Sequence, residues 1–241
     1  KNLFAPLPQD ILNTVPQWAR SPEGKWVGLS GRARVVVYNT DRLAVTDLPD
    51  SIAGFTDPKW KGRTGWAPAN ASFQSMVSAM RIVWGEEKAR EWVKGIQANQ
   101  PKVFPNNTSI VRAVAAGEID AGFVNHYYLH QLIAEQGEGV KARNYFTPRG
   151  DAGSVVLVAG AGILDSASNK EAAEKFLRFM LSAPAQQYFA SQTYEFPLVS
   201  GVAKDRLLPD LEKLQKPDID LSRLDDVKGT QALLRAAGAI P

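Results

Sequence analysis

Short apolar segments that alternate with helical patterns constrain the fold of this chain more than any other feature of its sequence. The β-branched residues 35–37 precede a polar Asn-Thr pair, a pattern that predicts a buried strand ending in a turn. Further apolar strands are expected near residues 63–67, 119–124 and 154–160.

Helical patterns fill most of the sequence between and after these strands. Helices are expected at residues 72–83, 86–98, 108–116, 126–136, 169–181, 184–191, 204–214 and 226–237. Strands that are separated by helices predict a parallel sheet with helices on both faces, which is an α/β fold. Ligands of such sheets bind beside the carboxyl ends of the strands, so polar residues at strand-to-helix turns are candidates for a binding site.

The composition excludes several classes of function. The chain has no cysteine, so any metal ion would be held by oxygen or imidazole nitrogen, which favours hard cations. Its 28 Lys and Arg residues are scattered among 25 Asp and Glu residues without a dense basic run, and we therefore expect no nucleic-acid partner. No stretch of the sequence approaches the roughly 20 consecutive apolar residues of a membrane-spanning helix.

The most informative polar cluster lies in the segment D-A-G-F-V-N-H-Y-Y-L-H at residues 120–130. An apolar strand is expected to end at Val124, so Asn125, Tyr127 and Tyr128 fall on the turn into the next helix. A trivalent iron ion would stabilise the phenolate forms of both tyrosines, because a metal cation lowers the pKa of an oxygen ligand, and a free phenol has a pKa of about 10. Two adjacent tyrosines therefore make a compact site for a hard cation.

Two other interpretations of this cluster stay open at the level of local sequence. Tyr127 and Tyr128 are also suited to pack as amphipathic side chains with solvated hydroxyl groups. His126 and His130 stand at positions i and i+4, so they could share a metal ion on one helix face, or each could be hydrogen-bonded or exposed.

Two more polar turns are expected to follow strands of the same sheet. In W-A-P-A-N-A-S-F, Asn70 and Ser72 are both suited to cap a helix whose free N–H groups favour an anion. In F-P-N-N-T-S, Asn106 or Asn107 is placed to cap the next helix. Three such turns can face one cleft. Spaced acid-base pairs and enzyme fingerprints such as G-x-S-x-G, H-E-x-x-H and the Walker loop do not occur, so enzymatic chemistry has no support.

The order of these motifs resembles one known family. The segments R-V-V-V-Y-N-T, F-T-D-P-K-W-K-G-R-T-G, A-A-G-E-I-D-A-G-F-V-N-H-Y-Y and Y-E-F-P-L are similar to those of bacterial ferric-ion-binding proteins. Members of that family are the extracytoplasmic substrate-binding proteins of iron ABC transporters and have the two-lobed type II periplasmic binding protein fold. The similarity runs from A-P-L-P at residues 5–8 to the final helix, and it implies a binding protein rather than an enzyme.

The resemblance implies a set of site residues, position by position. Tyr127 and Tyr128 match the tandem tyrosines that bind Fe(III) in the family. The positions that match contacts to a synergistic anion, phosphate or carbonate, are Asn70, Ala71, Asn107 and Asn125. The first two stand where the family has a Ser-Gly pair, so the anion site is expected to be altered there. Some members carry a third tyrosine ligand just beyond, where Phe73 stands here and cannot bind a metal.

The resemblance also implies where the lobes lie. The C-terminal lobe is expected at residues 41–154 and 207–241, the remnant of the N-terminal lobe at 1–34 and 161–206, and inter-lobe hinge strands at 35–40 and 155–160. Family members begin with a further segment that contributes a His and a Glu, or equivalent residues, to iron. This chain starts after that segment, so we expect a truncated protein with an incomplete N-terminal lobe. An exposed sheet edge there favours dimerisation or domain swapping.

The implied function is capture of Fe(III) and its delivery to an ABC permease of the inner membrane. The expected location is the periplasm, or the outside of a Gram-positive membrane through a lipid anchor. An alternative keeps the fold and changes the cargo to an organic cation, an oxyanion or an iron chelate, with Tyr127 and Tyr128 as hydrogen-bonding walls. A less favoured alternative is a metal-dependent enzyme built on His126 and His130, for which the motifs supply no acid-base partner.

Overall fold

The computed structural model describes residues 3–241, and the chain forms two compact units. Unit 1 holds the described residues up to Arg32 together with Val156–Leu211 and Asp220–Ser222. Unit 2 holds Ala33–Val155, Glu212–Ile219 and Arg223–Pro241. The lobe and hinge limits expected from the sequence stay a prediction.

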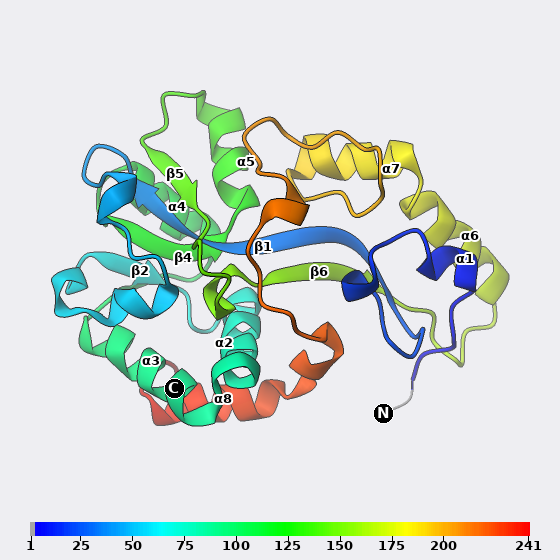
Figure 1. The fold of residues 1–241 in the computed structure, drawn as a ribbon, viewed down its shortest axis with the longest axis horizontal. Coiled ribbons are helices and arrows are strands. Elements are labelled where there is room, and N and C mark those ends of the chain that lie inside the picture. Colours follow the sequence, from blue (N-terminus) through cyan, green and yellow to red (C-terminus); the bar gives the residue numbers. More distant parts are fainter. Residues whose placement is uncertain (1–2) are drawn as a thin grey trace. The chain divides into compact units, whose positions relative to one another are not determined.

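Six strands are described, and their main path runs in the order β3-β2-β4-β1-β5, while β6 pairs with β1 (Figure 1). Their bounds are Val27–Asn39 for β1, Thr64–Trp66 for β2, Lys102–Val103 for β3, Ala121–Asn125 for β4, Ala142–Tyr145 for β5 and Val156–Ala161 for β6. β2 pairs in parallel with β3 and β4, whereas β1 runs antiparallel to β4 and β5. The expected parallel sheet is therefore wrong for β1. A fully apolar run such as residues 35–37 shows that a strand is buried, but it does not encode the direction of its neighbours.

The helices of unit 2 begin in different ways, and only some of them have a side-chain cap. They are α2 (Ala71–Trp84), α3 (Glu86–Ala98), α4 (Asn107–Ala115), α5 (Tyr127–Gln136) and α8 (Val227–Ala236), with short 3-10 helices at Val45–Asp47, Ile52–Thr56, Pro58–Trp60 and Ala152–Ser154. Oδ1 of Asn70 accepts the N–H of Ser72 at 3.0 Å, and Oδ1 of Asn106 accepts the N–H of Ser109 at 2.9 Å. α2, α3 and α8 pack against one another (Figure 1).

Aromatic side chains build the core of unit 2. Phe55, Trp60, Trp66, Phe73 and Phe123 are each at most 1% exposed. The ring centroids of Phe55 and Trp60 lie 4.7 Å apart, and those of Trp66 and Phe73 lie 5.5 Å apart at an interplanar angle of 88°. Such aromatic pairs add about 0.5–1.5 kcal/mol to the burial of their rings. Because Phe73 belongs to α2 and Trp66 to β2, this core fixes the start of α2 against the sheet.

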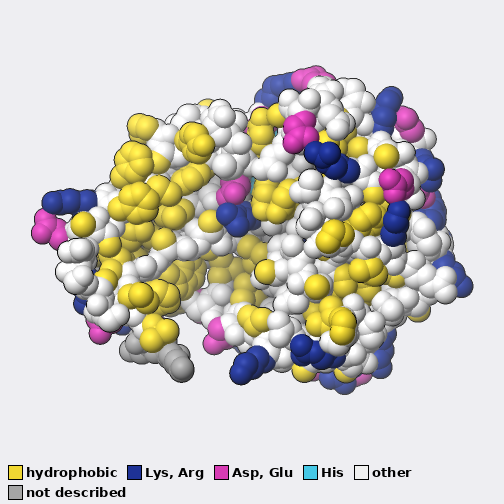
Figure 2. Space-filling model, turned by 180° about the vertical axis from the view of Figure 1, so that it is seen from behind, with side chains coloured by type: hydrophobic (Ala, Val, Ile, Leu, Met, Phe, Trp, Pro, Cys, Tyr) yellow, Lys and Arg dark blue, Asp and Glu magenta, His cyan; other side chains and the backbone are white. Residues whose placement is uncertain are grey.

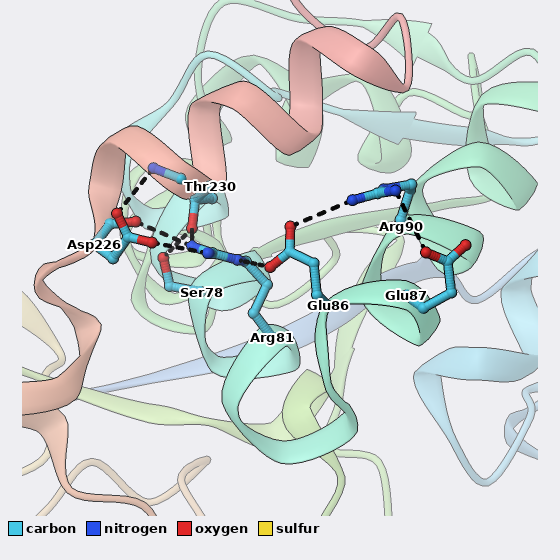
Figure 3. Close-up of polar contacts among 8 residues, drawn as sticks. Ser78, Arg81, Glu86, Glu87, Arg90, Asp226 and Thr230 are labelled. Atoms are coloured by element: carbon cyan, nitrogen blue, oxygen red, sulfur yellow. Dashed lines mark hydrogen bonds and ion pairs between the residues drawn. The ribbon is translucent and has the colours of Figure 1, made fainter.

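A polar network around Arg81 fastens α8 to α2 and α3 (Figure 3). Nη2 of Arg81 donates to Oδ2 of Asp226 at 2.8 Å, Nη1 donates to Oγ1 of Thr230 at 2.9 Å, and Nε donates to Oε2 of Glu86 at 2.5 Å. The buried hydroxyl groups of Ser78 and Thr230 are 2.6 Å apart and share a hydrogen bond. The C-terminal helix is thus part of unit 2 through both charge and hydrogen bonding.

Unit 1 has an aliphatic core. Its helices are α1 (Gln9–Leu12), α6 (Lys170–Met180) and α7 (Ala183–Tyr188), which a π-helix at Phe189–Thr193 continues, and a 3-10 helix spans Gln17–Ala19. The buried cluster consists of Leu7, Ile11, Leu12, Val15, Ala19, Val27, Ile163, Leu177, Leu181 and Leu198. Gly31 of β1 and Phe196 exchange two backbone hydrogen bonds of 2.8 and 2.9 Å. Oε2 of Glu195 accepts Nε of Arg32 at 3.1 Å and also accepts the hydroxyl of Ser30.

Seven of the eight expected helices are present, and the one expected at residues 204–214 is wrong. That segment forms turns and a single 3-10 helix, Leu211–Lys213. Pro209 lacks an N–H and its ring disfavours a helix that continues through it, while Oδ1 of Asp205 accepts the N–H of Leu207 at 2.8 Å in a local turn. The short strands β3 and β5 were not predicted. No helix within residues 3–241 has the length and apolar character needed to cross a membrane.

Candidate metal and anion site

The paired tyrosines lie where β4 passes into α5, as expected. β4 ends at Asn125, His126 precedes the helix, and Tyr127 and Tyr128 are the first two residues of α5. Their ring centroids are 4.3 Å apart with an interplanar angle of 32°. Tyr127 is buried and Tyr128 is half-buried. Two phenols therefore stand side by side at a helix start, where the helix dipole favours negative charge.

His126 holds this turn against β1. Its Nδ1 atom accepts a hydrogen bond from the backbone N–H of Ala33 at 3.1 Å. The backbone N–H of His126 donates in turn to the carbonyl oxygen of Ala33 at 3.0 Å. Nδ2 of Asn144 donates to the carbonyl oxygen of His126 at 2.8 Å. The imidazole is fully buried and lies 6.2 Å from the ring of His130. Because Nδ1 of His126 is engaged with the backbone, a metal ion shared by the two histidines fits this arrangement poorly.

The expected anion-site asparagines converge on a side chain that the sequence analysis missed, Arg34 of β1. Nη1 of Arg34 donates to Oδ1 of Asn125 at 3.1 Å, to Oδ1 of Asn107 at 3.2 Å and to Oγ of Ser72 at 3.1 Å. Arg34 lies directly opposite Asn125 in the register of β1 and β4. α4 can bring Asn107 close to β4 because the sheet carries Gly122 here, where a Cβ atom would overlap Cγ2 of Ile110.

Asn70 joins the cluster through Ser72. Its Oδ1 atom accepts the hydroxyl of Ser72 at 2.7 Å as well as the N–H of that residue, and Nδ2 of Asn107 lies 3.3 Å from the same oxygen. Ala71 is exposed, and its methyl side chain offers no polar group. The structure therefore brings together Asn70, Asn107 and Asn125. Ala71 could contact an anion only through its backbone. Asn106, not Asn107, caps α4.

Arg34 is a buried cation in which only one of the three guanidinium nitrogens has hydrogen-bond partners. It is 1% exposed, and burial lowers its pKa to about 9 against the opposing effect of Tyr127 and Tyr128, which leaves the guanidinium charged at neutral pH. Its Nε and Nη2 atoms are buried without a hydrogen-bond partner. Arginine is seldom fully buried unless it is paired. Its place directly before the apolar residues 35–37 was the one signal in the sequence that could have revealed it.

Phe73 and acidic or histidine clusters do not extend the site within the described residues. Phe73 belongs to the aromatic core described above, so it does not supply a ligand. Within residues 3–241, no group of three or more His, Cys, Asp or Glu side chains is arranged to hold a metal ion. The site thus combines two phenols, amide groups and one buried cation. Oxygen donors of this kind suit a hard metal cation, and the buried cation suits an anion.

Comparison with known proteins gives a consistent result. Residues 1–223 match the model of a family described as bacterial extracellular solute-binding protein. The chain is 36% identical over 243 residues to the major ferric iron-binding protein of Neisseria meningitidis, an alignment that covers 98% of this chain and 72% of the relative.

Solved structures with the same fold include two iron complexes. Iron-bound HitA from Pseudomonas aeruginosa superposes with a TM-score of 0.91 at 32% identity, over 98% of this chain and 76% of that one. A Trichodesmium protein, IdiA or FutA, in complex with iron and citrate superposes with a TM-score of 0.89 at 30% identity, over 99% of this chain and 78% of that one.

Proposed function

Because this chain belongs to the bacterial extracellular solute-binding proteins, we propose that it captures Fe(III) through Tyr127 and Tyr128 with the help of a small anion. The family and the α/β fold predicted from the sequence are confirmed by the family match and by the structural similarity to iron-bound HitA. The observation that carries the proposed cargo is the adjacent tyrosine pair at the start of α5, next along the chain to Asn125, which accepts a hydrogen bond from the buried Arg34.

Each part of the site has a chemical task in this proposal. Fe(III) is a hard Lewis acid that favours anionic oxygen ligands, and the chain contains no cysteine to offer a softer one. Two phenolates supply two of its ligands, and an exogenous anion such as phosphate or carbonate supplies more. Asn70, the backbone of Ala71, Asn107 and Asn125 hold that anion, and Arg34 supplies the positive charge beside it. These roles describe binding and release rather than catalysis.

The proposal includes a partner and a location. Members of a solute-binding family work outside the cytoplasmic membrane, so we place this protein in the periplasm or on a lipid anchor at the outer face of a Gram-positive membrane. The receiving partner is an ABC permease, to which the iron-loaded form docks. A protein that releases its cargo to a transporter needs ligands that can be protonated or displaced, which phenolates and a small anion both provide.

Visible absorption tests the metal ligands directly. A phenolate bound to Fe(III) gives a charge-transfer band in the visible range, so a titration of the protein with ferric citrate should develop such a band. Tyr127→Phe and Tyr128→Phe each remove one phenolate and should weaken the band and lower the affinity for iron by at least about tenfold, because each loses a ligand bond to a charged centre.

Tyr188→Phe is the matched control, because Tyr188 is 61% exposed on α7 and belongs to unit 1, whereas Tyr127 and Tyr128 belong to unit 2. This variant should titrate like the unmodified protein. A visible band that persists unchanged in both Tyr127→Phe and Tyr128→Phe would overturn the assignment of the tyrosines. Saturable iron binding without any band would overturn phenolate ligation as such.

A further inference from the structure

The start of α5 lacks the side-chain cap that several other helices of unit 2 have. The helices α2, α4 and α8 each follow a side chain that accepts a backbone N–H of the first turn, from Asn70, Asn106 and Asp226 respectively. The residue before α5 is His126, whose backbone is already helical, with φ −57° and ψ −38°, and whose side chain does not cap the helix. Tyr127 and Tyr128 therefore stand on a helix end that no side-chain cap fastens.

Neighbouring strands of unit 2 fasten this turn instead. From β1, Ala33 exchanges two hydrogen bonds with His126, at 3.1 Å to Nδ1 and at 3.0 Å from the backbone N–H. From β5, Nδ2 of Asn144 donates to the carbonyl oxygen of His126 at 2.8 Å. The contact of Asn144 is the shortest of the three, and among them it is the one that holds the carbonyl group.

This contact acts on the peptide group that leads into the first tyrosine. The carbonyl group of His126 and the N–H of Tyr127 belong to one planar peptide unit, so a bond that fixes the carbonyl also fixes the direction in which the backbone enters Tyr127. The carbonyl oxygen of an N-cap residue ordinarily accepts the first hydrogen bond of its helix, and it has a second lone pair for another donor. Asn144 is therefore placed to orient the first turn of α5, which bears both phenols.

The oxygen of the Asn144 amide argues against a purely stabilising role. Oδ1 is buried and has no hydrogen-bond partner in the part of the chain that the structure describes. A buried acceptor without a partner costs free energy, which offsets the gain from the bond at Nδ2. An apolar side chain of similar size would avoid this cost. Departures of this kind from full hydrogen bonding are expected at functional sites, and the nearest function here is the placement of the tyrosine pair.

We propose that Asn144 is a positioning residue for Fe(III) binding, which holds the start of α5 through the carbonyl group of His126 so that both phenolates reach one metal ion. This inference rests on the proposed function, because the ion is taken to bind Tyr127 and Tyr128. The ring centroids of the two tyrosines already lie 4.3 Å apart. Ligands that are held in place before the metal arrives lose less conformational freedom on binding. Asn144 itself is not a ligand.

Asn144→Leu tests this role, because leucine is of similar size but cannot donate to the carbonyl group of His126. In a titration with ferric citrate well below the unfolding temperature, the iron affinity should fall about tenfold, and the visible band should weaken or move, since the phenolates are less well placed. The thermal midpoint should fall by only about 2–4 °C, the effect of one lost hydrogen bond. A merely structural residue would lower the midpoint and leave the affinity and the band of the folded protein unchanged.

Asn39→Leu is the matched control. Asn39 is a buried residue of β1 whose Nδ2 atom donates to the carbonyl oxygen of Val114 at 2.7 Å, so this variant also removes an amide hydrogen bond to a backbone carbonyl group of unit 2. Val114 lies near the end of α4, away from the turn before α5. Asn39→Leu should lower the thermal midpoint at least as much as Asn144→Leu but leave the iron affinity unchanged.

A double-mutant cycle shows whether Asn144 acts through the tyrosine that follows its anchor. In a Tyr127→Phe background the phenolate nearest to the anchored peptide group is already lost, so adding Asn144→Leu should lower the remaining affinity by about threefold or less. Circular dichroism checks that each variant folds. Asn144→Ala removes the same hydrogen bond with a smaller side chain and takes the place of Asn144→Leu if leucine does not fit.

A measurement without iron separates this inference from the proposed function. Hydrogen exchange followed by NMR in the iron-free protein reports on the backbone N–H of His126, which should exchange about tenfold faster in Asn144→Leu and unchanged in Asn39→Leu. A missing visible band in the unmodified protein means that the proposed function fails, and the exchange rates still decide whether Asn144 anchors the turn. Unchanged exchange at His126, an unchanged iron affinity in folded Asn144→Leu, or fully additive effects in the cycle would each overturn the positioning role of Asn144.

Discussion

The two units of this protein differ in how far their aromatic side chains are exposed, although unit 1 also buries Phe196. In unit 2, Trp60, Trp66 and Phe123 are at most 1% exposed and contact other rings. In unit 1, Phe176 and Phe179 are 59% and 60% exposed. Figure 2 shows hydrophobic side chains gathered on the surface of unit 1. The large aromatic side chains of unit 2 therefore lie in its core, whereas unit 1 exposes large aromatic side chains at its surface.

Helix α6 of unit 1 shows the difference most clearly. Leu177 is 4% exposed and packs into the aliphatic core, while its neighbours Phe176 and Phe179 point to another face of the same helix. A helix that is apolar on two faces is expected where both faces are covered. The candidate site lies in unit 2, whose aromatic side chains are buried. A well-packed core helps to hold the side chains of a binding site in fixed positions.

The largest effect is expected from breaking the aromatic core of unit 2. Phe123 lies 5.5 Å from both Phe55 and Trp92, so Phe123→Ala should lower the free energy of unfolding by about 3–5 kcal/mol. Four of the six tryptophans, Trp60, Trp66, Trp84 and Trp92, belong to unit 2. Urea denaturation followed by tryptophan fluorescence will therefore report mainly on this unit.

Phe176→Ala is the matched control, since it makes the same chemical change on the exposed face of α6. It should shift the free energy of unfolding by no more than about 0.5 kcal/mol. Equal losses in the two variants would show that the face of Phe176 is covered in solution, and the contrast between the units would have to be abandoned.

The contrast between local and distant contacts also explains what the sequence could predict. Tyr127, Tyr128 and Asn125 were located correctly because one short segment contains both the strand end and the helix start. The contacts of Arg34 were not predicted, because they depend on the pairing of β1 with β4, and its partner Asn125 is 91 residues away in the chain. The direction of β1 escaped prediction for the same reason, since the apolar pattern of a strand is local and its pairing is not.

The next effect is expected at the surface of unit 1. Phe176 and Phe179 are mostly exposed on α6 with their ring centroids 6.4 Å apart, so the two rings form an apolar patch that a second copy of the chain could cover. We expect the purified protein to self-associate as its concentration rises. The double variant Phe176→Ser, Phe179→Ser should lower the weight-average mass measured by light scattering towards that of the 26.3 kDa monomer.

Val45→Ser provides the comparison in unit 2, because Val45 is 53% exposed but is aliphatic rather than aromatic. It should leave self-association unchanged. A monomer at all concentrations in the unmodified protein would show that the exposed rings alone do not support dimerisation, and the prediction of a dimer would then fail.

The smallest effect concerns the network that ties α8 to unit 2 (Figure 3). Arg81→Met removes the hydrogen bonds to Asp226, Thr230 and Glu86 but keeps most of the side-chain volume, so we expect a loss of about 1 kcal/mol in the free energy of unfolding. Arg90→Met is the control, because the side chain of Arg90 is 35% exposed and reaches Glu86 and Glu87 at 3.7 and 3.3 Å. Arg90→Met should lower the free energy of unfolding by less than Arg81→Met does.

The pH dependence of the stability difference between the unmodified protein and Arg81→Met shows which interaction of Arg81 causes it. The hydrogen bond from Arg81 and then the backbone N–H of Gly229 lower the pKa of Asp226 in the folded protein. The ionised carboxylate therefore stabilises the fold above the unfolded pKa of about 3.9, and this contribution is lost as the pH falls through the lower, folded pKa. Urea titrations at pH 7 and below pH 4 should show the gap between the unmodified protein and Arg81→Met narrowing in acid. A gap that is the same at both pH values would mean that Arg81 acts through packing and through Thr230 rather than through its charge.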